Sequence, residues 1–140
     1  MKKWTEAELI AEGYMIRNAK IYDADLDMSD HGCIALRMPI EGCGFGCVLG
    51  GECLGHGYLG AKEFDSYEKS LEYIMRIMDV VGVERFNDLQ DKYIRVVTKG
   101  WGGYIKIIGN LINDKWFDMG SFFDKGKQFD DELERLGVNG

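Results

Sequence analysis

The sequence predicts an α+β fold in one domain: a mainly antiparallel sheet of N-terminal strands and a hairpin, a central amphipathic helix, and a C-terminal hairpin. Three observations predict it. Apolar and polar residues alternate in residues 23–28 and 33–38, as in half-buried strands. Residues 66–81 instead repeat apolar residues at the three-to-four-residue spacing of a helix. With 140 residues, 46% of them hydrophobic, the chain can form one core but is too short for two.

We expect residues 1–13 to form an accessory N-terminal arm with a short helix. Thr5 and Glu8 have the spacing of a capping box, in which each side chain bonds the other residue's backbone N–H, and Gly13 marks the end. Residues 14–22 then have the composition of a strand.

The first predicted hairpin joins residues 23–28 to residues 33–38 through a turn. Asp30 in this turn can bond its own backbone, and Gly32 tolerates a positive φ. The two strands place six apolar side chains on the face that we expect to be buried: Ala24, Leu26, Met28, Ile34, Leu36 and Met38.

Residues 42–60 contain eight glycines in nineteen positions. If residues 42–49 are extended, one face of that strand carries almost no side chains. Each glycine weakens a strand by roughly 0.5–1 kcal/mol relative to alanine, so the segment requires an explanation. Either a ligand or another backbone approaches that face, or the strand is strongly bent or crosses under the central helix.

The central helix is expected over residues 66–81. Asp65 with Glu68 predicts its start, and Gly82 predicts a left-handed residue at its end. Its core-facing stripe is predicted to consist of Leu71, Ile74, Met75, Met78 and Val81. We interpret these methionines as core residues and not as a cofactor site.

A strand at residues 93–98, a glycine-rich loop and a second strand at residues 104–112 form the predicted C-terminal hairpin. Residues 119–140 are expected to be a C-terminal helical tail. Its apolar face would contain Phe122, Phe123, Phe129, Leu133 and Leu136.

Catalytic and cofactor signatures are not found, so we expect no enzyme activity and no cofactor. The two histidines, His31 and His56, lie in a turn and among glycines, so we interpret each as an exposed loop histidine and not as a catalytic base. The acidic run at residues 23–30 lacks the glycine and the distal glutamate of a calcium loop. No glycine-rich stretch has the spacing of a phosphate-binding loop.

The four cysteines are expected to be reduced thiols. No export signal or membrane-spanning stretch is seen, which favours a cytoplasmic protein, and cytosolic cysteines stay reduced. Their spacing matches no zinc ribbon or finger, so we predict no metal. A zinc site made by Cys43, Cys47, Cys53 and His56 nevertheless remains open.

Positive charge gathers in one part of an acidic chain. The net charge is −7, yet residues 85–116 contain six Lys or Arg and three Asp. We predict a nucleotide site here, because cations bond phosphate and aromatic rings stack on bases. Arg85, Arg95, Lys99 and Lys106 would bind phosphates, and Trp101 or Tyr104 would stack on the base. The alternative is that Trp101 fills a core or a subunit interface and the lysines are solvated.

Several short motifs resemble those of a widespread family of small phage and prophage proteins. The resemblance covers residues 14–117 and rests on these motifs: DHG (30–32), GGECLG (50–55), VVGVERFNDL (80–89), YIRV (93–96), IG (108–109) and DKWF (114–117). It implies no catalytic position. Small phage proteins of this size and composition are similar in kind to anti-defence proteins that act inside the host cell.

These observations lead to three hypotheses on function. The first is a non-enzymatic homo-oligomer that sequesters a host immune nucleotide signal, of the cyclic nucleotide or cyclic ADP-ribose type, without cleaving it. The second is an acidic, anti-CRISPR-like inhibitor that binds a host defence effector in place of nucleic acid. Its acidic surface would contain Asp23, Asp25, Asp27, Asp130, Asp131, Glu132 and Glu134. The third is a structural component of the virion.

Overall fold

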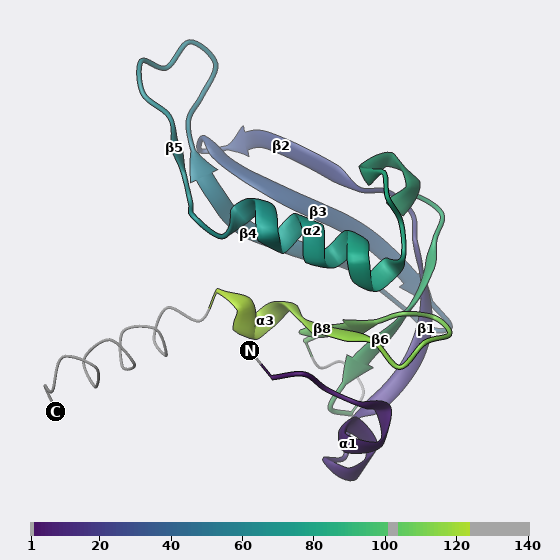
Figure 1. Ribbon diagram of the computed structural model, residues 1–140. Coiled ribbons are helices and arrows are strands. Elements are labelled where there is room, and N and C mark those ends of the chain that lie inside the picture. The colour runs from purple at the N-terminus through teal and green to yellow at the C-terminus, as the bar shows by residue number, and fades with distance from the viewer. Residues whose placement is uncertain (1, 101–103, 124–140) are drawn as a thin grey trace, which may run out of the picture.

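The computed structural model describes residues 2–100 and 104–123 and confirms the α+β fold with a mostly antiparallel sheet. Figure 1 shows the arrangement of its elements. In chain order they are α1 (Glu6–Ala11), β1 (Met15–Ile21), β2 (Asp25–Asp30), β3 (Cys33–Gly42), β4 (Phe45–His56), β5 (Asp65–Ser66), α2 (Ser70–Val81), the 3-10 helix η1 (Phe86–Leu89), β6 (Tyr93–Thr98), β7 (Ile107–Gly109), β8 (Trp116–Asp118) and α3 (Met119–Phe122).

The strands form one sheet in the order β5-β4-β3-β1-β6-β7-β8, and β2 pairs with β3. β1 and β2 follow one another along the same side of β3, because β1 pairs with residues 40–42 and β2 with residues 33–37. The predicted first hairpin is confirmed, and its turn has positive φ at both His31 (52°) and Gly32 (72°). The prediction that Leu26 is buried is wrong: it is 41% exposed, because β2 lies at the margin of the sheet with one strand neighbour.

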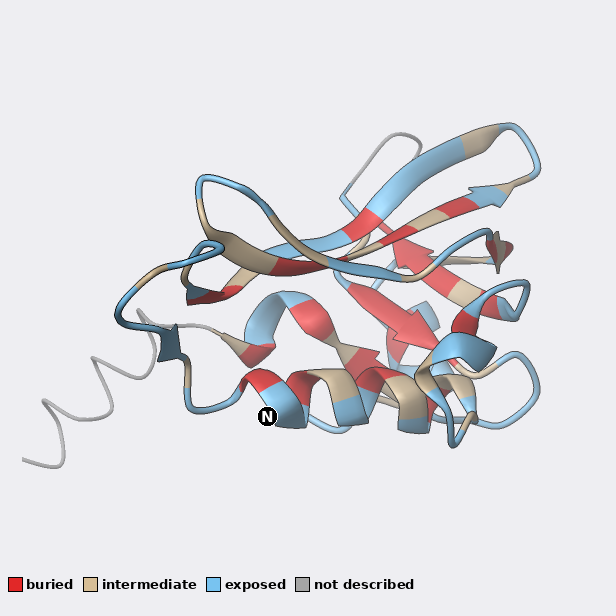
Figure 2. Cartoon of the chain, turned by 90° about the horizontal axis from the view of Figure 1, so that it is seen from above, coloured by how far each residue is buried: buried red, intermediate tan, exposed pale blue. Residues whose placement is uncertain are grey.

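Two separate apolar clusters lie on opposite faces of β1, β6 and β7. Alternate residues of β6 divide between them: Ile94 and Val96 join the main core, and Val97 joins the second cluster. α2 lies across the sheet over the main core, and the burial colours of Figure 2 place the buried residues between the helix and the strands. α1 contributes Leu9, which is fully buried in the second cluster. Leu9 and the partly buried Trp4 therefore pack the N-terminal arm against the sheet.

The start of α1 and the C-terminal end of α2 lie where the sequence predicts them, but the start of α2 does not. Thr5 caps α1 and bonds the N–H of Glu8, as predicted, and Gly82 ends α2 with φ 91°. The predicted start of α2 is wrong, because residues 65 and 66 pair with β4 and the helix begins at Ser70 without a side-chain cap.

The predicted core stripe of α2 is shifted. The fully buried apolar residues are Tyr73, Ile77 and Val80, whereas Leu71 and Met75 are 74% and 66% exposed. Ile74, Met78 and Val81 are half-buried beside the core. The helix is apolar on two overlapping faces, so the spacing of its residues does not fix which face is turned toward the core. The packing of Tyr73 against aromatic rings selects the face that is buried.

Tyr73 packs among the rings of Phe117, Phe122 and Phe123, with centroid distances of 6.0, 5.9 and 4.9 Å. Its hydroxyl is buried and has no hydrogen-bond partner within the described part of the chain. Burial and the nearby Glu52 carboxylate raise the pKa of this phenol. The hydroxyl therefore stays neutral and lowers stability, since a buried polar group without a partner is unfavourable.

We expect Tyr73→Phe to raise the free energy of unfolding by about 1 kcal/mol, because it removes this unpaired hydroxyl and keeps the ring. Urea denaturation measures the change. Tyr93→Phe is the matched control, since Tyr93 is 56% exposed and its change should lie within about 0.5 kcal/mol of zero. A loss of stability in Tyr73→Phe would mean that the hydroxyl has a buried partner such as water.

Residues 42–49 are not one extended strand, because residues 43 and 44 form the turn between β3 and β4, but the rest of the glycine-rich segment up to His56 is the bent strand of one of the two interpretations. β4 pairs with β3 along its length, with register shifts opposite residues 33–35 and 35–37. Gly50 and Gly51 both have positive φ, 88° and 91°, beside the second shift. Leu49 and Leu54 turn into the core. The glycines therefore serve the bend of the strand.

The C-terminal hairpin is shorter than predicted. Its second strand covers Ile107–Gly109 only, and both Tyr104 and Ile112 are more than four-fifths exposed. The predicted tail begins as α3, whose Phe122 is buried. The tail residues Phe129, Leu133 and Leu136, and the acidic residues 130–134, lie outside the described residues.

Candidate functional site

Arg95, one of the predicted phosphate-binding residues, is used inside the fold. Its side chain is 12% exposed. Its Nε donates to the carbonyl of Asn110 (2.7 Å), its Nη2 donates to the carbonyl of Asn113 (2.8 Å), and its guanidinium lies over the ring of Trp116 (4.3 Å). Nη1 also bonds Glu6 in α1 (3.2 Å). The guanidinium thus fixes the turn between β7 and β8, and each of its three nitrogens donates one hydrogen bond within the fold.

The other predicted residues lie in two places. Arg85 precedes η1, whereas Lys99 follows β6 and Lys106 precedes β7 at the same end of that strand pair. The ammonium of Lys99 lies over the ring of Tyr14 (4.9 Å). Lys106 covers Gly120, where an added Cβ would lie 2.9 Å from the lysine side chain.

Tyr104 is 91% exposed, and Trp101 lies outside the described residues. Of the described residues of the predicted nucleotide site, Lys99, Tyr104 and Lys106 therefore adjoin the loop between β6 and β7, whereas Arg95 is used inside the fold and Arg85 lies before η1.

The expectation of four free thiols is wrong for two of them. Cys33 and Cys53 form a disulfide, with Cα atoms 5.4 Å apart. The pairing of β3 with β4 brings these residues together across 20 positions of sequence, at a separation that suits a disulfide. Cys43 and Cys47 are free and exposed, and partial burial raises the pKa of the Cys47 thiol.

A bulge in β4 places His56 beside this disulfide. Cys33 pairs with His56, and Ala35 pairs with Cys53. An advance of two residues along β3 therefore corresponds to three residues along β4, which is one residue more than in a regular pair. In a regular strand, residues three apart point to opposite faces. The extra residue reverses this relation, and Cys53 and His56 both lie on the face that carries Cys33.

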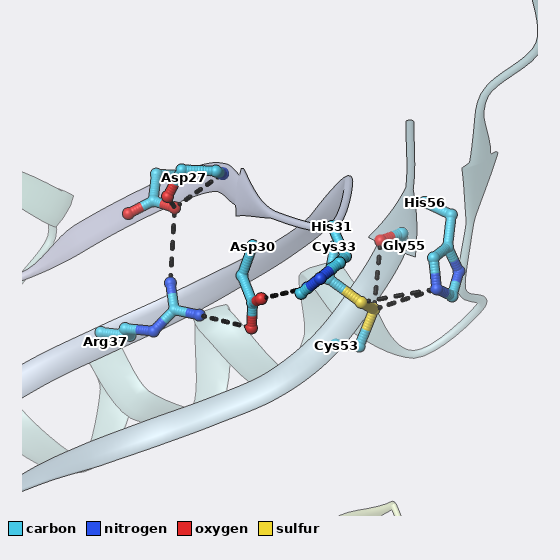
Figure 3. A network of polar contacts seen from close by, with 9 residues as sticks. Asp27, Asp30, His31, Cys33, Arg37, Cys53, Gly55 and His56 are labelled. Atoms are coloured by element: carbon cyan, nitrogen blue, oxygen red, sulfur yellow. Dashed lines mark hydrogen bonds and ion pairs between the residues drawn. A yellow bond between two sulfur atoms is a disulfide. The ribbon is translucent and has the colours of Figure 1, made fainter. Parts of the chain in front are cut away.

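Figure 3 shows the imidazole of His56 pointing at both sulfur atoms. Its Nε2 lies 3.4 Å from Sγ of Cys33 and 3.7 Å from Sγ of Cys53. Its Nδ1 lies 2.6 Å from the hydroxyl of Tyr67, which orients the ring. We name Cys33, Cys53 and His56 the sulfur–histidine cluster. Chemically it joins a disulfide, which a thiol can reduce, to an adjacent base and metal ligand.

Sequence reasoning found two of the three residues of this cluster. The open zinc set contained Cys53 and His56 but paired them with Cys43 and Cys47 instead of Cys33. Cys47 lies opposite Ile40, seven residues along β3 from Cys33, so the structure does not bring it to the cluster. The only signal for Cys33 was its place at the start of the second hairpin strand, and that did not indicate its partner.

An acidic strand adjoins the cluster across the hairpin turn, also in Figure 3. Arg37 on β3 contacts Asp27 (3.4 Å) and Asp30 (3.8 Å). Hydrogen bonds from the backbone and hydroxyl of Ser29, with Arg37 nearby, lower the pKa of Asp27. The pKa of Asp25 is raised instead, by the hydrogen bond to the Asp27 side chain and by the negative charges of Asp27 and Asp23. Among the described residues, the carboxylates of Asp23 and Asp25 therefore form no ion pair, unlike Asp27 and Asp30.

In the described residues, no helix is long and apolar enough to cross a membrane. Comparison of the chain with protein-family models, with curated proteins and with solved structures gives no match in any of the three.

Proposed function

We propose that the protein acts by binding a partner protein through the acidic edge, which we define as Asp23, Asp25 and the exposed side of β2. One observation carries this proposal: within the described residues β2 pairs only with β3, and the carboxyl group of Asp25 lies within hydrogen-bond reach of that of Asp27 and near the charge of Asp23, a close group of acids on an unpaired strand edge. Leu26, next to Asp25 in β2, is 41% exposed. The edge thus offers negative charge, an apolar contact and unpaired backbone groups together.

A cationic surface is the partner chemistry that this edge fits best. Positive groups would relieve the repulsion of Asp25 by the neighbouring Asp27 and Asp23, and complementary charge speeds association and selects the partner. A protein groove that otherwise holds nucleic acid has this character. The resemblance to phage proteins adds that such a partner would be a host defence effector. Charged edges also prevent sheet-to-sheet aggregation, and the experiment must separate the two roles.

The test measures binding of the immobilised full-length chain to a purified host RNA-guided nuclease at low and high salt. We expect Asp23→Asn with Asp25→Asn to weaken binding at least about 10-fold and to reduce its salt dependence. The control is Glu63→Gln with Glu68→Gln, two exposed acids away from the edge, which should bind within about 2-fold of wild type. Equal binding by the edge variant, or aggregation of that variant without loss of affinity, would leave the carboxylates a protective role only.

We propose nucleotide sequestration as the second function, on the exposure of Tyr104 and Lys99 on either side of residues 101–103. Here the chain is denatured after purification, and mass spectrometry examines the small molecules that it releases. Its mass in solution is measured in parallel. An intact nucleotide recovered from a multimer supports capture, and a cleaved product would indicate a hydrolase. No nucleotide together with a salt-sensitive protein complex supports the acidic-edge proposal.

A further inference from the structure

We propose that the sulfur–histidine cluster is a zinc site that opens when its disulfide is reduced. The observation is the convergence of Sγ of Cys33, Sγ of Cys53 and one ring nitrogen of His56 within 4.8 Å of one another. Two thiolates and an imidazole are a ligand set that Zn²⁺ prefers. The inference is independent of the acidic edge.

The spacing of the donors suits a tetrahedral ion. Zinc–sulfur bonds of about 2.3 Å and zinc–nitrogen bonds of about 2.0 Å place sulfur and nitrogen ligands about 3.5 Å apart. The two distances from Nε2 of His56 to the sulfurs, 3.4 and 3.7 Å, already lie near that value. Only the two sulfurs must separate, to about 3.8 Å, once their bond is broken.

The imidazole is also oriented as a metal ligand. Nε2 faces the sulfurs, and Nδ1 contacts the hydroxyl of Tyr67 at 2.6 Å. A histidine ligand generally donates its other ring N–H to an oxygen, which fixes the tautomer with the metal-facing nitrogen free. The hydroxyl of Tyr67 is the oxygen beside Nδ1 of His56. His56 is exposed while both cysteines are half-buried, so solvent can reach the ion and supply a fourth ligand.

The reaction has two balanced steps. A dithiol breaks the Cys33–Cys53 bond: its two electrons go to the two sulfurs, each sulfur takes one proton, and the dithiol closes to its own disulfide. Zn²⁺ then replaces the two thiol protons, which pass to solvent. The oxidised cluster cannot hold zinc in this way, because neither sulfur is a thiolate. The oxidation state therefore determines whether the ion binds.

The experiment compares oxidised full-length chain with chain reduced by dithiothreitol and desalted without oxygen. Both are titrated with Co²⁺ and then with Zn²⁺. We expect one ion per reduced chain, thiolate-to-cobalt charge-transfer absorption, the strong visible bands of tetrahedral cobalt, and displacement by zinc. The oxidised chain should show none of these. Binding of equal strength to the oxidised chain, or no binding to the reduced chain, would overturn the proposal.

Variants locate the site. Cys33→Ser, Cys53→Ser and His56→Ala should each lose the tetrahedral cobalt spectrum, and Tyr67→Phe should lower zinc affinity by about 10-fold or more. Cys43→Ser with Cys47→Ser and the exposed-histidine control His31→Ala should bind as wild type. Loss of binding in these controls instead would move the site elsewhere and overturn the assignment.

A second measurement covers the case in which a variant or reduction itself unfolds the chain. Zinc should raise the melting temperature of the reduced Cys43→Ser, Cys47→Ser chain, because only the folded form presents the ligand set. It should leave the oxidised form of that chain unchanged. Equal zinc stabilisation of a chain that also carries Cys33→Ser and Cys53→Ser would contradict the proposal.

Discussion

Arg95→Ala is expected to lower the free energy of unfolding by about 3–4 kcal/mol. The guanidinium makes two hydrogen bonds to backbone carbonyls, and bonds from a charged donor contribute about 1.5–3 kcal/mol each. The substitution also removes the stacking on Trp116 and the tie to Glu6 in α1. For a chain of this length the loss corresponds to a fall in melting temperature of about 10 °C. Thermal and urea unfolding of the oxidised protein measure it.

The matched control is Arg85→Ala, since Arg85 is exposed and makes no side-chain hydrogen bond or ion pair to any residue that the structure describes. Its effect on stability should stay within about 0.5 kcal/mol. If Arg95→Ala unfolds like wild type but releases a bound nucleotide, the structural role assigned to this guanidinium is wrong. The phosphate-binding hypothesis for residue 95 would then be restored.

Gly50→Ala should destabilise the protein by about 3–4 kcal/mol. With φ at 88°, any other residue adopts the left-handed region at a cost of about 1–2 kcal/mol. An added Cβ would also lie 2.2 Å from the carbonyl oxygen of Leu36, an atom of the paired strand that cannot move without shifting β3. Overpacking of this kind costs about 1–3 kcal/mol more.

Gly51→Ala separates these two causes. Gly51 has φ of 91°, and its added Cβ would meet nothing within 4 Å, so only the conformational cost of about 1–2 kcal/mol should be seen. Chemical denaturation of both variants gives the difference. Equal losses at the two positions would mean that the contact of the added Cβ with Leu36 costs nothing beyond the backbone conformation.

Local signals predicted the local structure. The Thr5 cap, the turn at Gly32 and the left-handed Gly82 each depend on a few neighbouring residues, and the structure has all three. The rotation of α2 depends on what packs against it: Tyr73 meets phenylalanines that lie more than 40 positions further along the chain. The spacing of residues within the helix does not depend on those contacts, so it predicts the wrong buried stripe.

The candidate site was harder to predict for the same physical reason. A cation beside aromatic residues in sequence indicated a nucleotide site, but Arg95 turns to carbonyls 15 and 18 residues away. The sulfur–histidine cluster needs strand pairing and an added residue in β4 before its three side chains share a face. Residue spacing in a regular strand predicts the opposite placement of Cys53 and His56.

α1 packs on the second apolar cluster and not on the main core, so it can leave the sheet while the rest of the molecule stays folded. A six-residue helix does not persist alone in water, and Leu9 is its one buried residue. We therefore expect α1 to detach and return many times while the main core stays intact. Each detachment uncovers Val97 and Ile107, so this outer side of β6 and β7 is where a protease or a chaperone would first gain access to an otherwise folded chain.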